Sequence, residues 1–524
     1  MTARERSSTR TSDECLSARS LRLLVTIGLA ACGGSNAVAP RGLSVVLGAG
    51  QSDTVLSVLP EPLVVALHEP GAAGQIVQFQ AMTDTGSGCC EYFAYLQPTD
   101  TTSLSQYPGG PAPQVAVRTD ANGAARVYVR LNQFAQRGAI IVRVPVFGIV
   151  DTVPETATPG APIRLQKQND TAVVVGATDT LHAFVYDQYD NLRPNDTVTY
   201  HLISGPITLT GAAVTGTALG LAAVSATARG ARPDTTKISV VPQGTIAFGT
   251  STGIVVSNLD GSQARVLPVQ NVGNVRWSPD GKTIVYDQGS RGFSTGSAAL
   301  YSVTISDGTT TTIDSGAIGH YWPQFSRDGT WLYWTDISNV LYNYTSVLWR
   351  AHPDGTMKDS IAGTDGSWTS SPSSDGSQLV YSDLTYSALH VFTLASSAET
   401  AFSVHGFAPR WAPNSASIAY LAISQGGGGP IDIIQADGSG NRVVKTNNYD
   451  FGLDWSPDGQ WLISQNDSTT NFDIINVKTG MTLPLPFTNS NMWSPSWGPS
   501  GAYPISHAQS LAIGARPRGA HAGR

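Results

Sequence analysis

Trp277-Ser278-Pro279-Asp280-Gly281 is the stretch that decides the fold, because versions of it recur five more times toward the C-terminus. The fourth residues of the six copies lie at positions 280, 328, 375, 414, 458 and 500, so neighbouring copies are 39 to 48 residues apart. A repeat of this length corresponds to one four-stranded blade of a β-propeller. Ser, Pro, Asp and Gly are turn-forming residues, and five copies precede an alternating strand pattern. We therefore interpret the motif as a structural turn and not as a catalytic site.

The two ends of the repeat region complete each other. The last copy, Trp497 to Gly501, has no strand after it, whereas Thr245-Ile246-Ala247-Phe248 begins the region with no motif before it. These segments are predicted to share one blade, which closes residues 244–501 into a ring of six blades and removes exposed sheet edges. The region resembles the TolB-type β-propeller family, whose W-S-P-D-G-K-x-I-x-F repeat is matched most fully by the first and fifth copies.

The N-terminal segment predicts export. Arg19 and Arg22 precede an apolar run at residues 23–31, which is too short to span a bilayer but suits the central part of a signal peptide. The run ends in Leu29-Ala30-Ala31-Cys32-Gly33, which resembles the bacterial lipobox. An ordinary secretory leader with a chance cysteine is the alternative.

The lipobox resemblance implies lipid attachment at Cys32. In that family the cysteine is acylated and becomes the mature N-terminus, so we expect residues 1–31 to be a lipoprotein signal peptide and residues 32–42 a tether to the membrane. Gly33 instead of Asp implies sorting to the outer membrane, with the protein periplasmic or surface-exposed. Acyl chains anchor firmly because each buried CH₂ contributes about 0.8 kcal/mol.

Residues 43–150 and 160–242 are predicted to form two β-sandwich modules, because short strand-like runs alternate there with Gly, Pro and Asp turns. Residues 117–127 contain Thr119-Asp120-Ala121-Asn122-Gly123-Ala124-Ala125, which resembles the T-D-x-x-G-x-A signature of bacterial Ig-like domains of the invasin and intimin type. Residues 183–191 resemble the V-x-D-x-x-G-N segment of the same family. The resemblance implies spacer or adhesive modules, followed by the six-bladed propeller.

Three polar residues in the second module allow two interpretations. Asp187, Asp190 and Asn191 could supply oxygen ligands to calcium, but Asx side chains also form turns by accepting bonds from their own backbone. We favour the turn and predict no metal site.

The composition excludes some classes of function. Only 13% of the 524 residues are charged, while 54 Gly and 31 Pro supply many turns. The formal net charge is -7 and no basic cluster indicates nucleic-acid binding. Cys89 and Cys90 lack zinc-site spacing, and we expect thiols in preference to a strained vicinal disulfide. Residues 502–524 are predicted to form a disordered tail.

An aromatic position recurs four residues before the first residue of the motif. The first copy has Gly273 there, and the other five have Tyr321, Trp368, Phe407, Phe451 and Trp493. If this position tops the innermost strand, the five rings surround the mouth of the channel and can stack on sugars or grip a peptide. His320 and Asp450, one residue earlier, would be polar contacts. The alternative is that the rings pack between adjacent blades.

The sequence favours a binding protein over an enzyme. The propeller histidines form no H-x-H or H-E-x-x-H pattern, and Gly249 to Gly253, a formal G-x-S-x-G match, joins two short strands and is predicted to be a hairpin turn. We expect a membrane-anchored lipoprotein that binds a protein, peptide or glycan, with no cofactor. The alternatives are a propeller enzyme, such as a metal-assisted polysaccharide lyase, and a structural envelope protein.

Overall fold

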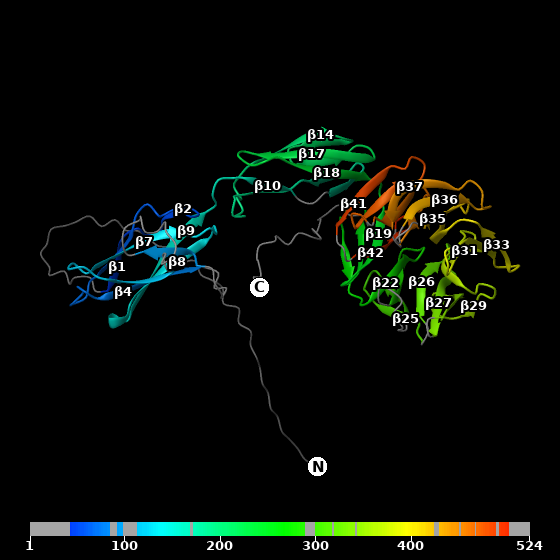
Figure 1. Cartoon of the computed structure of the whole chain (residues 1–524), viewed down its shortest axis with the longest axis horizontal. Coiled ribbons are helices and arrows are strands. Elements are labelled where there is room, and N and C mark those ends of the chain that lie inside the picture. The colour runs from blue at the N-terminus through cyan, green and yellow to red at the C-terminus, as the bar shows by residue number, and fades with distance from the viewer. Residues whose placement is uncertain are drawn as a thin grey trace, which may run out of the picture. The chain divides into compact units, whose positions relative to one another are not determined.

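The strands of this chain form two compact units, the first mainly of residues up to Thr156 and the second mainly of residues from Ala157 onward. Within the described residues, every regular element except the 3-10 turn η2 (Pro145–Phe147) is a β-strand (Figure 1). The predicted all-β class is confirmed. The computed structural model describes residues 42–83, 92–97, 113–167, 171–288, 299–316, 319–340, 343–423, 429–449, 452–466, 468–488 and 492–501.

Several predicted features lie outside the described residues. They are the leader at residues 1–31, the lipidation site Cys32, the cysteines at positions 89 and 90, and the tail at residues 502–524. Of the predicted ligand contacts, Asp450 and Phe451 also lie outside the described residues.

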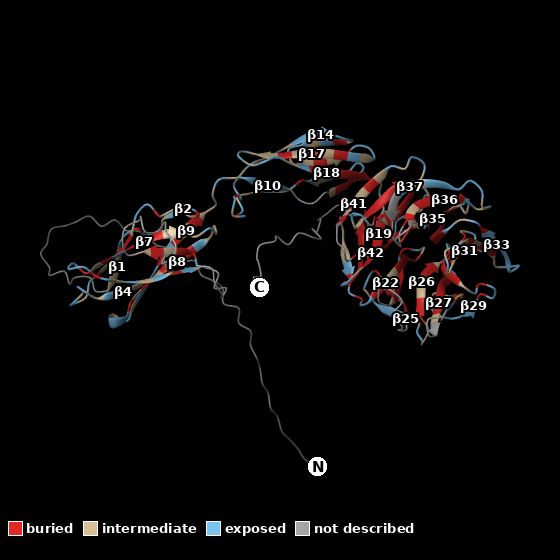
Figure 2. Ribbon diagram, in the orientation of Figure 1, coloured by how far each residue is buried: buried red, intermediate tan, exposed pale blue. Residues whose placement is uncertain are grey.

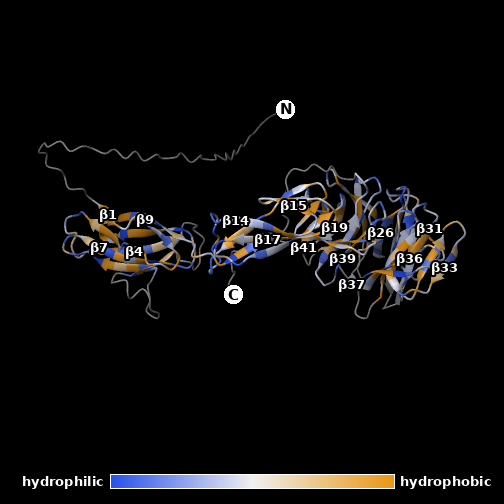
Figure 3. Cartoon of the chain, turned by 90° about the horizontal axis from the view of Figure 1, so that it is seen from above, coloured by the Kyte–Doolittle hydropathy of each residue, from blue (hydrophilic) through white to orange (hydrophobic). Residues whose placement is uncertain are grey.

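The first unit is a β-sandwich of a four-stranded and a five-stranded sheet. The four-stranded sheet has the order β1 (Leu43–Leu47), β3 (Leu63–Leu67), β7 (Ala124–Leu131), β5 (Ala94–Gln97). The other has the order β2 (Ser52–Thr54), β9 (Ile149–Thr158), β8 (Arg137–Val144), β4 (Ile76–Thr83), β6 (Gln114–Arg118). Alternate residues of β4, namely Val77, Phe79 and Ala81, are buried, as period-2 patterning requires. Figure 3 shows hydrophobic stretches, coloured orange, along the strands of this unit.

The turn around Asp120 passes the chain from one sheet of this sandwich to the other. Asp120 Oδ1 accepts hydrogen bonds from the backbone N–H groups of Asn122 (2.8 Å) and Ala124 (2.9 Å). Gly123 has φ +78°, and a Cβ there would lie 2.7 Å from the Leu67 carbonyl oxygen, so glycine is required. The strand before the turn, β6, pairs with β4, whereas β7 pairs with β3 and β5.

Glu155, on β9, is a buried carboxyl group in this sandwich. Its residue is 2% exposed, and neither carboxyl oxygen accepts a hydrogen bond of normal geometry. Burial raises the pKa of Glu155 from 4.5 to about 7, against a weaker opposing interaction with the Gln51 backbone. The protonated form is therefore the one that the fold accommodates.

The first unit should lose stability as the pH rises from about 4.5 to about 7. In this window the folded state holds a proton that the unfolded chain has released, so the free energy of unfolding falls, by at most about 1.4 kcal/mol per pH unit. Glu155→Gln should remove this dependence and unfold at a higher temperature than the wild type at alkaline pH. Thermal unfolding of both proteins across this range checks it, and equal pH dependence would contradict it.

The second unit begins with a smaller β-module in three sheets. The largest has the order β11 (Thr171–Val174), β18 (Asp234–Val241), β17 (Gly220–Ala228), β14 (Val198–Ser204). The others are β12 (Thr178–Thr180), β16 (Ala213–Gly216), β15 (Ile207–Thr210) and the pair β10 (Arg164–Lys167), β13 (Ala183–Tyr186). Val241 and Ile246 share one hydrophobic cluster with Trp461, and Ser239 Oγ donates to the Pro484 carbonyl at 2.6 Å, so this module packs on the propeller.

Asp187 of this module forms the predicted Asx turn. Its Oδ1 accepts hydrogen bonds from the backbone N–H groups of Tyr189 (2.8 Å) and Asn191 (3.0 Å), and its Oδ2 accepts from Gly160 N–H (2.7 Å) and Asn191 Nδ2 (2.9 Å). Burial alone would raise the pKa of Asp187, but these hydrogen bonds outweigh burial and lower it. Asp190 Oδ1 instead pairs with Arg164 at 2.8 Å. The turn interpretation is confirmed for Asp187.

The rest of the second unit is a six-bladed β-propeller, with four antiparallel strands in each blade. Blade 1 consists of β22 (Val272–Trp277), β23 (Thr283–Gln288), β24 (Ala299–Thr304) and β25 (Thr310–Asp314). Blade 2 consists of β26 (Gly319–Phe325), β27 (Leu332–Val340), β28 (Asn343–Ala351) and β29 (Asp359–Ser360). Blade 3 consists of β30 (Ser367–Pro372), β31 (Gln378–Asp383), β32 (Leu389–Thr393) and β33 (Ala398–Phe402). Blade 4 consists of β34 (Gly406–Trp411), β35 (Ser417–Ala422), β36 (Gly429–Gln435) and β37 (Arg442–Tyr449). Blade 5 consists of β38 (Asp454–Trp455), β39 (Trp461–Gln465), β40 (Asn471–Asn476) and β41 (Thr482–Thr488). Blade 6 consists of β42 (Met492–Trp497), β19 (Thr245–Thr250), β20 (Gly253–Asn258) and β21 (Arg265–Leu267). The buried residues run along the strands of the ring (Figure 2).

The repeated motif forms the turn between the first two strands of a blade. Ser278 Oγ donates to Asp280 Oδ1 at 2.6 Å and accepts from Thr283 N–H at 3.0 Å, while Asp280 Oδ1 also accepts from Lys282 N–H. The motif aromatics pack on the preceding blade: Trp277, for example, lies in one cluster with Ala247 and Ile254 of blade 6. The structural interpretation of the motif is confirmed. The same Ser–Asp bond recurs at Ser326, Ser373 and Ser456.

The ring closes as the sequence predicts. β42, from the C-terminal end, pairs antiparallel with β19, from the start of the region, with Trp497 opposite Ile246 and Met492 opposite Thr250. Gly498 N–H adds a hydrogen bond to the Thr245 carbonyl at 2.8 Å. The innermost strand of blade 6 thus comes from the opposite end of the propeller sequence from its other three strands.

Truncation after Thr488 should destabilise the whole propeller, because it removes β42 and leaves β19 as an exposed edge. Truncation after Gly501 is the matched control and should leave the propeller transition unchanged. Differential scanning calorimetry of both truncated chains and the full chain checks this. Equal melting temperatures for the two truncations would refute the role of β42 in closure.

Candidate functional site

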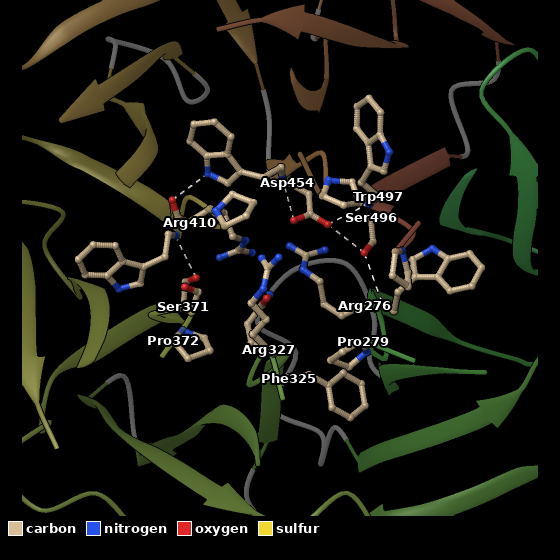
Figure 4. A pocket seen from close by; sticks show the side chains of 18 of the residues that line it. Arg276, Pro279, Phe325, Arg327, Ser371, Pro372, Arg410, Asp454, Ser496 and Trp497 are labelled. Atoms are coloured by element: carbon tan, nitrogen blue, oxygen red, sulfur yellow. Dashed lines mark hydrogen bonds between the residues drawn. The ribbon is translucent and has the colours of Figure 1, made fainter. Parts of the chain in front are cut away.

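A cavity of about 290 Å³ lies where the motif ends of the six innermost strands meet (Figure 4). All six blades contribute to its lining. Prolines of the motif turns lie around it, namely Pro279, Pro372, Pro413, Pro457 and Pro499. The cavity therefore has an apolar border built from the turns that hold the blades together.

The residue just before the first motif residue faces this cavity in every blade, and all six are polar. Of these residues only Asp454 is more than 9% exposed. The six are Arg276, Gln324, Ser371, Arg410, Asp454 and Ser496. We call this set the polar ring.

Arg276 and Arg410, from blades 1 and 4, are the two cations of the polar ring. They are 4% and 3% exposed. Arg276 Nη1 donates to the adjacent Val275 carbonyl at 2.7 Å, whereas its Nε has no partner. Arg410 donates from Nε to the Leu453 carbonyl at 3.1 Å and from Nη1 to the Pro409 carbonyl at 2.8 Å. Backbone carbonyls therefore orient both groups without neutralising them.

Burial lowers the pKa of Arg276, with Asp454 and Asp287 acting against it. Burial and the nearby charge of Arg276 hold the pKa of Arg410 well below its ordinary value, with Asp454 again opposing. A guanidinium nevertheless keeps its proton in proteins. The cavity thus holds two charges whose burial is costly.

Asp454 is the only anion of the polar ring, and its oxygens already have donors. Oδ1 accepts from Trp455 N–H at 2.9 Å, and Oδ2 accepts from Ser496 Oγ at 3.0 Å and Trp497 N–H at 2.9 Å. Within the described residues, neither Arg276 nor Arg410 forms an ion pair within 4.0 Å. Asp454 therefore offsets part of their charge at longer range.

Arg327 adds a third cation at the rim. It occupies the motif position where four of the six copies have proline, and it is exposed. In Figure 4 the side chains of Arg276, Arg327 and Arg410 all point toward the middle of the pocket. Three cations face one carboxylate here, in a chain whose formal net charge is -7.

The four described members of the predicted aromatic ring, Tyr321, Trp368, Phe407 and Trp493, lie at the other end of the innermost strands and pack among residues of neighbouring blades. Trp368 and Phe407 are 5% and 6% exposed, while Tyr321 and Trp493 are partly exposed. Trp493 Nε1 donates to the Gly273 carbonyl at 2.9 Å. The indole of blade 6 therefore contacts blade 1 at the position where blade 1 has glycine instead of an aromatic residue. Ligand contact by these rings stays a prediction, and among the four described rings Tyr321 and Trp493 are the partly exposed ones.

Aromatic contacts continue from blade to blade at that end. The Trp368 ring lies 4.9 Å from Trp322 of blade 2 and 6.0 Å from Tyr386 of its own blade, and Tyr386 lies 5.6 Å from Phe407 of blade 4. A continuous row of rings thus joins three blades.

His320, the predicted polar contact on β26, is 3% exposed and lies in a charged cluster between blades 1 and 2. Its Nδ1 bonds Asp336 Oδ1, and its Nε2 lies 3.5 Å from Asp314 Oδ2. Lys358 Nζ also pairs with Asp314. The structure therefore places His320 among interblade partners, and contact with a ligand stays a prediction.

Trp368→Ala should lower the free energy of unfolding by about 3 to 5 kcal/mol, as loss of a buried core aromatic does. Met357→Ala is the control, because Met357 is 68% exposed and its truncation should change stability little. Chemical denaturation of both variants checks the difference. A Trp368→Ala protein as stable as the control would show that the ring is dispensable for packing and would favour the binding role.

Sequence reasoning missed the polar ring, although the same alignment contains its signal. The position before the first motif residue is polar in all six copies. An innermost propeller strand is mostly buried, and six polar residues at one buried position need a shared explanation. Convergence on the channel supplies that explanation.

The formal G-x-S-x-G match is a turn, as the sequence predicts. The Gly249–Gly253 segment is the hairpin turn between β19 and β20, with Thr250 Oγ1 donating to the Gly253 carbonyl at 2.8 Å. Among the described residues, no group of three or more His, Cys, Asp and Glu side chains is arranged to hold a metal ion. Nor does any helix in that part of the chain have the length and apolarity needed to cross a membrane.

Comparison with known proteins gives distant similarity. No family model matches the sequence. An uncharacterised protein of Agrobacterium fabrum is 26% identical over 162 residues, which cover 28% of this chain and 53% of that protein, so the chain spans about half the length of this relative. TolB from Acinetobacter baumannii is 16% identical with a TM-score of 0.43, covering 57% of this chain and 83% of TolB. An oligogalacturonate lyase in complex with manganese is 16% identical with a TM-score of 0.31, covering 47% of this chain and 72% of the lyase.

Proposed function

We propose that this chain is an exported binding protein, anchored to the bacterial outer membrane through Cys32, whose propeller recognises a protein, peptide or glycan. The observation that carries the binding proposal is the cavity at the motif end, where polar side chains of all six blades converge. A few oriented polar groups inside an apolar border are typical of ligand sites. At about 290 Å³, the cavity can hold one residue of a polymer.

The β-modules suit the role of spacers in this proposal. The first unit is a sandwich, and the module at residues 160–242 packs on the propeller through Ser239 and Val241. Their resemblance to invasin- and intimin-type Ig-like domains supports a position between the membrane and the propeller. The leader and the lipidation site are proposed from the sequence.

Cys32→Ser should release the protein from membranes, because it removes the thiol that would receive the acyl chains. Fractionation of cells followed by immunoblotting measures the change, and Cys15→Ser is the matched control that should stay membrane-bound. Membrane association of Cys32→Ser equal to that of the control would contradict the anchor.

A bulky residue at the rim should block binding. Arg327→Trp places an indole over the cavity, whereas Lys282→Trp adds the same ring on a neighbouring turn outside the cavity lining. Peptide and glycan arrays probed with the wild type should show ligands that Arg327→Trp loses and Lys282→Trp keeps. Binding that both variants retain would place the ligand site elsewhere on the molecule.

A further inference from the structure

Like charges gather at the motif end of the channel without a counter-charge in contact. Arg276 and Arg410 are buried, Arg327 stands at the rim, and in Figure 4 their side chains all point toward the middle of the pocket. The single carboxylate, Asp454, is fixed by three donors and forms no ion pair with them within 4.0 Å. Buried charges are normally paired, so this arrangement needs an explanation.

Arg276 gives the clearest sign of an absent partner. The residue is only 4% exposed, and its Nε has no hydrogen-bond acceptor. The one hydrogen bond of its guanidinium goes from Nη1 to the neighbouring Val275 carbonyl. Donors of this group therefore remain available toward the cavity.

Arg410 approaches the cavity from the opposite side of the ring and is already oriented. Three bonds from its guanidinium end on the carbonyls of Leu453, Pro409 and, at 3.4 Å, Ser370. A group held in this way loses little conformational freedom when it binds a ligand. Ser371 and Ser496 add hydroxyl groups to the same lining.

We propose that the motif end of the channel binds an oxyanion, a carboxylate or a phosphate group of the ligand, between Arg276, Arg410 and Arg327. Guanidinium groups match the planar and bidentate geometry of these anions. Asp454 faces the same cavity and limits the excess positive charge, which favours one anionic group over a polyanion. The inference rests on the proposed binding function and adds the chemistry of the ligand.

Inorganic phosphate and acetate are probes for the two groups that could supply the oxyanion, a phosphate group and a carboxylate. Isothermal titration calorimetry of the full chain, at constant ionic strength set with NaCl, should show saturable binding of at least one of them. Binding of phosphate alone assigns a phosphate group to the site, and binding of acetate alone assigns a carboxylate. Saturation by neither probe overturns the inference.

Three variants test whether the arginines carry this binding. Arg410→Gln should weaken it at least about tenfold, because a charged bidentate partner is lost. Arg327→Glu, a change at an exposed residue that does not depend on core packing, should abolish it by placing a second carboxylate at the rim. Lys282→Gln removes an exposed cation outside the cavity and should leave the affinity unchanged. If all three variants bind like the wild type, the anion does not occupy the cavity and the inference fails.

The same measurements separate this inference from the proposed function. Phosphate and acetate need no macromolecular partner, so arginine-dependent anion binding without any array ligand would overturn the binding function alone. Array binding that Arg327→Trp blocks, without saturable binding of either anion, would overturn the anion site alone.

Discussion

The pairing of β42 with β19 is the constraint on which the propeller depends. It joins residues from the two ends of a 258-residue region, since residues 244–501 form the ring, and it supplies the innermost strand that β19 would otherwise lack. Once the ring is closed, the innermost strands have to converge on one axis. The character of the residues at their ends then decides what the channel can bind.

The motif separates structural from variable positions. Ser278 and Asp280 bond within their turn, and Trp277 packs on the preceding blade, so none of the three is free to change its role. The residue before the first motif position differs from blade to blade, and where it is Ser371, Asp454 or Ser496 its side chain accepts a hydrogen bond from the backbone of the next blade. Two of the three arginines, Arg276 and Arg410, occupy this variable position, and Arg327 occupies the third motif position, where four of the six copies have proline.

The fold could be predicted from the sequence because its signals are local or periodic. Turn chemistry and the 39-to-48-residue spacing identified the blades, and the unmatched ends of the repeat identified the closure. The facing of individual side chains was harder to predict, because the innermost strands contain β-bulges, as between Tyr321 and Gln324, where Trp322 has φ +54°. Such a bulge breaks the alternation of period 2 along the strand. The direction in which the motif aromatic points therefore does not predict the direction of the side chain four residues before it.

The candidate site was harder to predict than the fold, because its side chains come from different blades and meet only across the ring. Arg276 and Arg410 lie in blades 1 and 4, and no local pattern in either segment indicates that their side chains approach each other. Glu155 shows the same limit in the first unit, since nothing in the β9 sequence distinguishes a buried carboxyl from an exposed one. Long-range placement, and not local propensity, sets the charge environment in both cases.

Ring closure brings the arginines of the cavity to the motif end of the channel, where within the described residues no ion pair offsets the charge of Arg276 or Arg410. Crystals soaked in selenate, a tetrahedral oxyanion that scatters anomalously, show whether an anion binds there. We predict an anomalous peak among the guanidinium groups of Arg276, Arg327 and Arg410 in the wild type that is absent in Arg410→Gln. Peaks confined to the outer surface, with none in the channel, would contradict the account.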